Sequence, residues 1–306
     1  MLRALFGGLF LALRRLPVAF VLYFTNLLFA VVIVVPLLPA LIDDAGPTPR
    51  ALAERLDLEF LVDFLFHRRG VIDAVGTAAG AGALAMILLQ CFLAGGVLTL
   101  ARDSRERFSL GRFMQGAGRW FFPFFRLLPF LALWLFALYW VNRGLNLGFE
   151  KLFEEEHREK WALGMAVVKQ ALVVLFWFFG SVVLDFARVR AVALEDRRML
   201  LGFLAGLNFV LRHFLSTLCL SGFLALLGLA FLGGYLWLAH VGLEASRWLA
   251  PLTIGLQQAL VLVQHFLRVW RASSQMIFFQ LSRRDEEMAP AVILGPTADP
   301  ADAPIS

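Results

Sequence analysis

Long apolar runs dominate the pattern of hydrophobic and polar positions in this chain. A helix needs about 20 apolar residues to cross the hydrocarbon core of a bilayer. Four uncharged runs are long enough, and two more are each interrupted by one base, Arg126 or Lys169, which can reach the interface from near a helix end. The pattern predicts an all-α polytopic membrane protein with six transmembrane helices, at 16–42, 74–101, 120–142, 161–184, 213–243 and 250–267.

A shorter amphipathic stretch precedes each odd-numbered span. The three stretches, "LFGGLFLALRRL", "FMQGAGRWFFPF" and "FLAGLNFVLRHF", align on Gly8, Gly116 and Gly206. Each even span also ends on a leucine followed four residues later by an arginine: Leu98/Arg102, Leu184/Arg188 and Leu267/Arg271. We interpret these as three repeats of interfacial helix plus transmembrane hairpin, at about 1–102, 103–188 and 189–271. The alternative is that cytoplasmic helix ends resemble one another because basic residues gather there.

The chain forms one predicted membrane domain, residues 1–287. The outer loop 43–73 has apolar residues at helical spacing, which predicts an amphipathic helix on the outer interface. Residues 288–306 are rich in proline and alanine and predict a disordered cytoplasmic tail.

Basic residues indicate how the chain is threaded. Of 28 Lys and Arg, 17 fall at the N-terminus and in the loops after the even spans, and nine fall in the opposite loops. Because retained basic residues mark the cytoplasmic side, both termini are predicted to be cytoplasmic. The arginine bias is typical of a bacterial source, so we expect a bacterial inner membrane. Hydrophobic residues make up 60% of the chain. The net charge of +5 is explained by the basic residues that set the topology, so no nucleic-acid partner is expected.

Polar residues in and beside spans four and six form the candidate intramembrane site. Span six carries two polar faces: one holds Gln257, Gln264, Arg268 and Arg271, and a neighbouring one holds Gln258 and His265. The full set is Lys169, Ser181, Asp185, Arg188, Gln257, Gln264, His265 and Arg268. One interpretation is structural: interhelical hydrogen bonds, an i,i+3 ion pair between Asp185 and Arg188, and an interfacial anchor at Lys169. The other is a polar binding site or path that reaches the cytoplasm.

Small residues at the start of span two suggest close helix packing. Gly76 and Gly80 form a GxxxG pattern, which lets helices approach in lipid; a backbone-lined permeation path is the alternative. Cys91 and Cys219 both fall inside predicted spans and are expected to be free.

Motifs that carry catalysis are missing from the sequence. It contains no HExxH, GxSxG or P-loop, and "EEEH" at 154–157 is better explained as a solvated acidic face than as a metal site. We therefore predict no catalytic residue, metal or cofactor, and a protein that is not an enzyme.

Several segments together carry a family resemblance. With "FGGLFLALRRLPVAFVLYFTNLLFA", "LDLEFLVDFL", "AGGVLTLARD" and "LDFARVRAVALEDRR", the chain resembles uncharacterised six-span bacterial inner-membrane proteins. These are similar in turn to the membrane domain of some glycerophosphodiester phosphodiesterases. The resemblance implies a helical membrane fold and transfers no active site.

The expected function follows from these observations. We expect a scaffold or accessory protein that contacts membrane lipid or a partner membrane protein, and the sequence indicates no particular oligomeric state. The alternative is a small-molecule or lipid transporter that uses the polar residues of spans four and six.

Overall fold

The computed structural model describes residues 1–35, 69–103, 108–153, 159–238 and 250–293, and all regular structure in these ranges is helical. The helices are α1 (Leu2–Arg14), α2 (Leu16–Val34), α6 (Arg69–Arg102), α7 (Leu110–Phe125), α8 (Leu128–Phe153), α9 (Glu159–Leu194), α10 (Met199–Arg212), α11 (Phe214–Leu238) and α12 (Ala250–Ile293).

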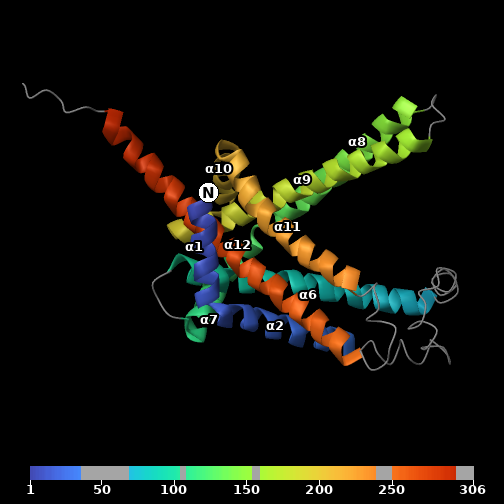
Figure 1. Cartoon of the computed structure of the whole chain (residues 1–306), viewed down its shortest axis with the longest axis horizontal. Coiled ribbons are helices and arrows are strands. Elements are labelled where there is room, and N and C mark those ends of the chain that lie inside the picture. The colour runs from blue at the N-terminus through green and yellow to red at the C-terminus, as the bar shows by residue number, and fades with distance from the viewer. Residues whose placement is uncertain (36–68, 104–107, 154–158, 239–249, 294–306) are drawn as a thin grey trace, which may run out of the picture.

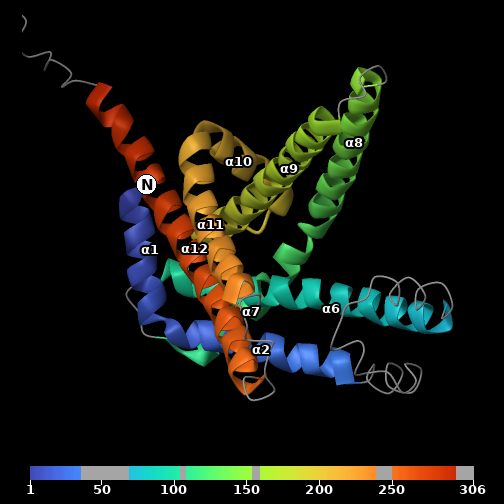
Figure 2. The same ribbon diagram turned by 45° about the vertical axis from the view of Figure 1, so that its right-hand side comes forward.

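The helices meet at one end of the molecule and diverge from it (Figures 1 and 2). We call this end the base; it comprises α1, α7 and α10 with the parts of α6, α9 and α12 that pack against them. Its core contains large side chains that are almost fully buried, among them Phe113, Trp120, Phe124, Phe186 and Met276. The base is therefore the packed core of the protein, and the long helices project from it.

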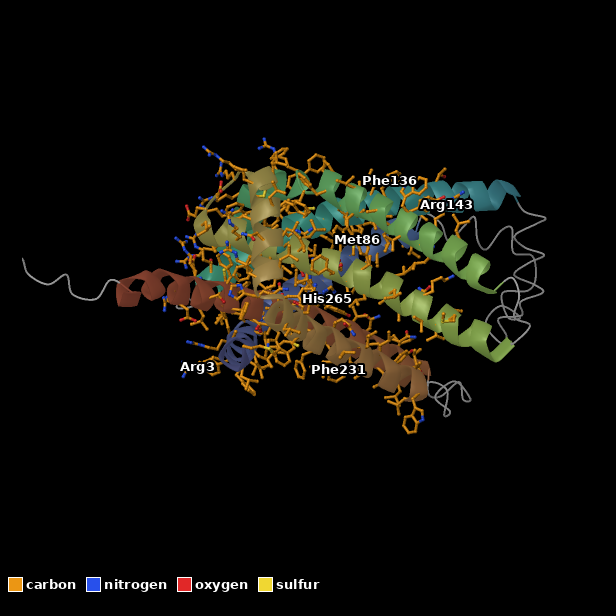
Figure 3. The ribbon with its side chains drawn as sticks, turned by 90° about the horizontal axis from the view of Figure 1, so that it is seen from above. Arg3, Met86, Phe136, Arg143, Phe231 and His265 are labelled. Carbon is orange, nitrogen blue, oxygen red and sulfur yellow. The ribbon has the colours of Figure 1, made fainter. Side chains whose placement is uncertain are left out.

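Beyond the base, the long helices present bulky apolar side chains outward. Figure 3 shows Phe136 on α8 and Phe231 on α11 among them, and Phe136 is 59% exposed. Within the described residues, five helices are long and apolar enough to cross a membrane: Leu16–Val34, Gly76–Arg102, Leu128–Gly148, Gly164–Leu194 and Phe214–Leu238. Hydrocarbon is the solvent that satisfies such a surface. The described chain is therefore consistent with the predicted helical polytopic membrane protein.

A break separates each of the three short base helices from the span that follows. The helical backbone is interrupted at Arg15 (φ −118°, ψ 30°), at Arg126–Leu127 and at His213 (φ −112°, ψ 37°). Pro17, at the start of α2, has no N–H to continue the hydrogen-bond ladder of α1. α1 consequently lies crosswise to α2 (Figures 1 and 2), as an interfacial helix should.

The third predicted span starts too early. Residues 120–125 belong to α7, where Trp120 and Phe124 are buried in the base, and the span itself begins at Leu128. Arg126 marks the break between the two helices instead of lying inside a span. Trp120 and Phe124 are apolar because they pack against protein, which hydropathy alone does not distinguish from contact with lipid.

α12 also differs from the prediction. It is not among the five candidate spans found in the described residues, and Gln257, Gln258, Gln264 and His265 make its first half more polar than those spans. The helix runs unbroken for 44 residues, about 66 Å at 1.5 Å per residue. Its second half, predicted to be a cytoplasmic segment, crosses the centre of the base, where Ser274 and Met276 are fully buried. It also continues to Ile293, into the stretch predicted to be disordered from residue 288.

Some predictions fall outside the described residues. These are the helix predicted in the outer loop, over the part up to residue 68, the acidic face predicted at 154–157, and the tail from residue 294.

Each short base helix packs against a long helix that corresponds to an even-numbered predicted span: α7 on α6 (span two), α10 on α9 (span four), and α1 on α12 (span six). At each contact stands one of the three aligned glycines, and its partners are Thr99 for Gly116, Ala187 for Gly206 and Ser274 for Gly8. A Cβ on Gly8 would stand 2.7 Å from the Ser274 Cα, so only glycine permits this approach. The arginines of the Leu/Arg pairs do not lie at a constant distance in sequence from the residues that contact these glycines. Arg102 lies three residues after Thr99, Arg188 lies one residue after Ala187, and Arg271 lies three residues before Ser274.

The predicted packing role of Gly76 and Gly80 finds no counterpart among the described residues. No described residue lies within 4 Å of the place where a Cβ would stand at either glycine, and both are exposed. Close approach in α6 occurs instead at Gly95 and Gly96, where α7 lies against it. The reason is that the helices have already diverged at the level of Gly76. Cys91 and Cys219 are both free, as predicted, although Cys219 is exposed.

Candidate functional site

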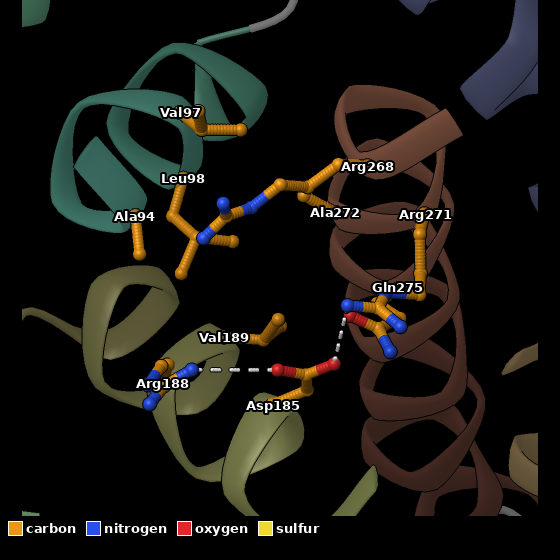
Figure 4. Close-up of a pocket in the computed structure, with 10 residues that line it drawn as sticks. All are labelled: Ala94, Val97, Leu98, Asp185, Arg188, Val189, Arg268, Arg271, Ala272 and Gln275. Carbon is orange, nitrogen blue, oxygen red and sulfur yellow. Dashed lines mark ion pairs between the residues drawn. The ribbon is translucent and has the colours of Figure 1, made fainter. Parts of the chain in front are cut away.

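A polar cavity lies between α6, α9 and α12, where the base meets the diverging spans. Its volume is about 80 Å³. The polar lining consists of Asp185, Arg188, Arg268, Arg271 and Gln275; the remainder is aliphatic, from Ala94, Val97, Leu98, Val189 and Ala272 (Figure 4). We call it the arginine cavity. Three of the predicted site residues, Asp185, Arg188 and Arg268, therefore come together.

Asp185 lies between two arginines in this cavity (Figure 4). Its Oδ1 is 3.5 Å from the Arg188 Nη1, which is the predicted i,i+3 ion pair, and its Oδ2 is 3.5 Å from the Arg271 Nη2. The second pair joins α9 to α12. Both distances exceed those of good charge-assisted hydrogen bonds, about 2.7–2.9 Å, so one carboxylate bridges two guanidiniums loosely.

Arg268 is held by neutral groups. Its Nη1 donates a hydrogen bond to the Oε1 of Gln90 on α6. The Gln90 Nε2 donates in turn to the Asn26 Oδ1 on α2 at 2.7 Å, and the Asn26 Nδ2 donates to the Leu22 carbonyl at 2.6 Å. This relay of amides fixes the position of the guanidinium without neutralising its charge.

The other predicted site residues have separate structural partners. The Lys169 Nζ donates to the Asn146 Oδ1 on α8 at 2.7 Å, and the Ser181 hydroxyl donates to the Trp177 carbonyl of its own helix at 3.0 Å. Gln257 donates to the Tyr235 hydroxyl at 2.7 Å, and Gln264 to the Gly228 carbonyl at 2.9 Å. His265 is half-buried and does not line the cavity. Both glutamines thus tie α12 to α11, as the structural interpretation expects.

Two residues that the sequence analysis missed complete the arginine cavity's supports. Gln90 and Asn26 are the single amides in apolar runs two and one, and an amide in lipid needs a partner. The rule that identified Gln257 and Gln264 would therefore have found them. Gln275, whose Nε2 donates to the Ser221 Oγ at 3.2 Å, lies beyond the predicted span and gave no such signal.

A second, larger cavity of about 340 Å³ lies in the base, between the end of α6, α7 and the junction of α1 with α2. Its lining includes Arg15, Arg102, Arg112, Arg119 and Asp103. Beside it, Glu195 accepts hydrogen bonds from the Arg102 Nη1 at 2.5 Å and the Arg119 Nη2 at 2.9 Å. These two bonds lower the pKa of Glu195, and they hold this residue at φ 54°, in the left-handed region. Glu195 therefore ties α6 and α7 to the end of α9.

The residues that the structure describes contain no group of three His, Cys, Asp or Glu side chains arranged to hold a metal. Comparison of the chain with protein-family models, with curated proteins and with solved structures finds no match. The functional argument consequently depends on the geometry of this chain alone.

Proposed function

We propose that this chain is a non-enzymatic integral membrane protein, a scaffold or accessory protein whose base contacts lipid head groups at the cytoplasmic face of a bacterial inner membrane. The observation that carries the proposal is that the short base helices are apolar on two faces. On α1, Leu5, Gly8 and Ala12 are buried against protein, whereas Phe6 and Phe10 are more than 60% exposed.

The same division recurs in the other two base helices. α7 buries Phe113 and Trp120 but exposes Met114 and Phe122, and α10 buries Val210 but exposes Leu204 and others. Basic residues accompany these faces; the Arg14 guanidinium lies over the exposed Phe10 ring, 5.6 Å from its centroid. A helix of this kind rests with its apolar side about 5–10 Å into the boundary between head groups and acyl chains. Nearby arginines each add about 1 kcal/mol of attraction to an anionic surface.

The threading that we propose has six spans and both termini in the cytoplasm. The N-terminus and the end of α12 lie toward the same end of the molecule (Figure 1), which favours an even number of crossings. The first half of α12 would supply the sixth crossing beside the five apolar helices. The excess of basic residues beside the base then follows the positive-inside rule.

We also propose that the fold arose from three repeats. The support is the order of packing: each base helix contacts the last helix of the preceding repeat, and α1 of the first repeat contacts α12 of the third. Three repeats arranged around an axis would give this closed order. One observation does not fit three repeats: the Leu/Arg pairs lie at a different distance from the glycine contact in each repeat.

Spin labels test the lipid contact directly. Single cysteines at Phe10, Phe122 and Leu204, in a chain whose Cys91 and Cys219 are replaced by serine, are labelled and reconstituted in anionic vesicles. Power saturation should place all three labels below the phosphate level, accessible to oxygen and shielded from a water-soluble nickel reagent. A label at Ala4, which is fully buried, is the control and should be shielded from both. Labels at Phe10, Phe122 and Leu204 that are open to nickel would contradict the proposal.

The transporter remains a second candidate because one observation favours it, the arginine cavity between α6, α9 and α12. Gln257 and Gln264 give it less support, since each already bonds to α11. Loss of substrate flux in a folded Asp185→Ala chain would favour the transporter over the scaffold.

A further inference from the structure

The arginine cavity has more positive than negative charge. Three guanidiniums, those of Arg188, Arg268 and Arg271, line it, and among the described lining residues Asp185 is the one acid. The formal charge of this set is therefore +2. A cation placed away from bulk water is costly unless an anion or several hydrogen-bond acceptors compensate it.

Compensation by this chain is incomplete. Arg268 bonds to the neutral Gln90, so its charge is positioned but not balanced. The Arg188 Nε is buried without a hydrogen-bond partner in the described structure. Asp185 is shared at 3.5 Å by Arg188 and Arg271 and is directed between them (Figure 4). Donors thus exceed acceptors in the cavity.

The chemistry of the lining selects the class of ligand. A guanidinium presents up to five N–H donors in a planar fork that matches the oxygens of a carboxylate or phosphate. Three forks from two helices surround one small space, which suits an anion with oxygens on several sides better than a flat carboxylate. The volume of about 80 Å³ corresponds to two or three waters at about 30 Å³ each, which is enough for a tetrahedral head but not for a whole nucleotide.

We propose that the arginine cavity binds a phosphate group, held by Arg188, Arg268 and Arg271. The group belongs either to an anionic lipid, whose acyl chains lie outside between the diverging spans, or to free phosphate. The site does not depend on contact between the base helices and the bilayer, so this proposal and the proposed function can fail separately.

Two binding measurements on the purified full chain distinguish the sources. In the first, inorganic phosphate is titrated calorimetrically into protein in a phosphate-free detergent. In the second, native mass spectrometry compares phosphatidic acid with the diacylglycerol that has the same chains and lacks only the phosphate. Saturable binding of phosphate assigns a free ion, and preference for phosphatidic acid over diacylglycerol assigns a lipid. If neither occurs, the proposal is wrong.

Variants locate the binding in the cavity. Arg268→Gln and Arg271→Gln should each weaken it about tenfold or more, since each removes charge-assisted hydrogen bonds. Arg284→Gln, the same change at an exposed position of α12, should alter it less than about twofold. Equal affinities for the cavity variants and the Arg284 control would overturn the proposal.

A variant that should raise the affinity, and not lower it, covers the case in which the arginine variants do not fold. Asp185→Asn removes the competing carboxylate and should raise the affinity several-fold in protein that circular dichroism shows to be folded. An unchanged or lower affinity in that folded variant would also refute the site.

Discussion

Gly95 is a position where one added methyl group should push two helices apart. In Gly95→Ala the new Cβ would lie 2.9 Å from the Trp120 Cβ, 3.0 Å from the Gly116 carbonyl oxygen and 3.3 Å from the Ala117 Cα. Two of these three atoms belong to the backbone of α7, so α6 and α7 must separate to accept the methyl. The Cβ of Trp120 cannot turn away either, because the backbone of α7 fixes its position, and the rest of that side chain is buried.

The expected magnitude follows from two opposing terms. Overpacking of this kind costs about 1–3 kcal/mol. Alanine is a better helix former than glycine and returns about 0.5–1 kcal/mol. We therefore expect Gly95→Ala to lower the free energy of unfolding by about 1–2 kcal/mol, since backbone contacts place the steric cost in the upper part of its range.

Gly80→Ala is the matched control. It makes the same change in the same helix, and no described residue lies within 4 Å of its new Cβ. Only the propensity term applies, so Gly80→Ala should be neutral or stabilising by up to about 1 kcal/mol. Because that term cancels in the comparison, the two variants should differ by about 1–3 kcal/mol. The measurement is reversible unfolding in mixed micelles, followed by circular dichroism. Variants that agree to within about 0.5 kcal/mol would refute the contact between α6 and α7.

Two further predictions concern the base and the threading. Acid should weaken the link at Glu195: its pKa is lowered in the folded chain, so its stabilisation is present above its unfolded value of about 4.3 and is lost as pH falls through the folded pKa. Thermal melting between pH 6 and 3 should therefore depend less on pH in Glu195→Gln, and an identical pH profile would contradict the ion pairs. For the threading, cysteines at Asp103, Asp196 and Asp285 should react with an impermeant reagent only in inverted vesicles, and one at Gly148 only in intact cells; a reversed result at any position breaks the topology.

The sequence predicted those parts of the fold that depend on local pattern. The apolar runs located five spans, and the amphipathic stretches located α1, α7 and α10, because hydropathy and helical period are properties of a short window. The start of the third span was wrong because Trp120 and Phe124 are apolar for burial in protein. Only the contacts of the folded chain separate these two uses of an aromatic residue.

The role of the second half of α12 was missed because its polar residues are buried in protein and not exposed to water. Ser273, Ser274 and Gln275 look like a solvated segment, yet all three are buried at the centre of the base. Gln275 is satisfied by Ser221 of α11, and Ser274 lies against Gly8 of α1. These partners are far away in sequence, so no window around residue 274 contains them.

The candidate site also has one part that the local sequence predicts and another that only the contacts between helices create. The pair Asp185 and Arg188 was predictable because i,i+3 residues share a helix face in any helix. Arg271 reaches Asp185 only because α12 crosses α9, and Arg268 meets Gln90 only because α12 crosses α6. The cavity is thus a product of helix arrangement, although each of its arginines stands in the sequence as an ordinary basic residue at a helix end.

The position of the cavity follows from how helices associate in lipid. Burial of apolar surface gives no drive between spans there, so close contact must come from small residues and polar pairs. This chain places both in the base, with glycines at Gly8, Gly95, Gly116 and Gly206 and the Glu195 ion pairs, while the outer parts of the spans carry bulky exposed side chains. The base is consequently closely packed, and the spans diverge from it. The arginine cavity lies at the junction, where a fixed set of guanidiniums can face a ligand that enters between the spans.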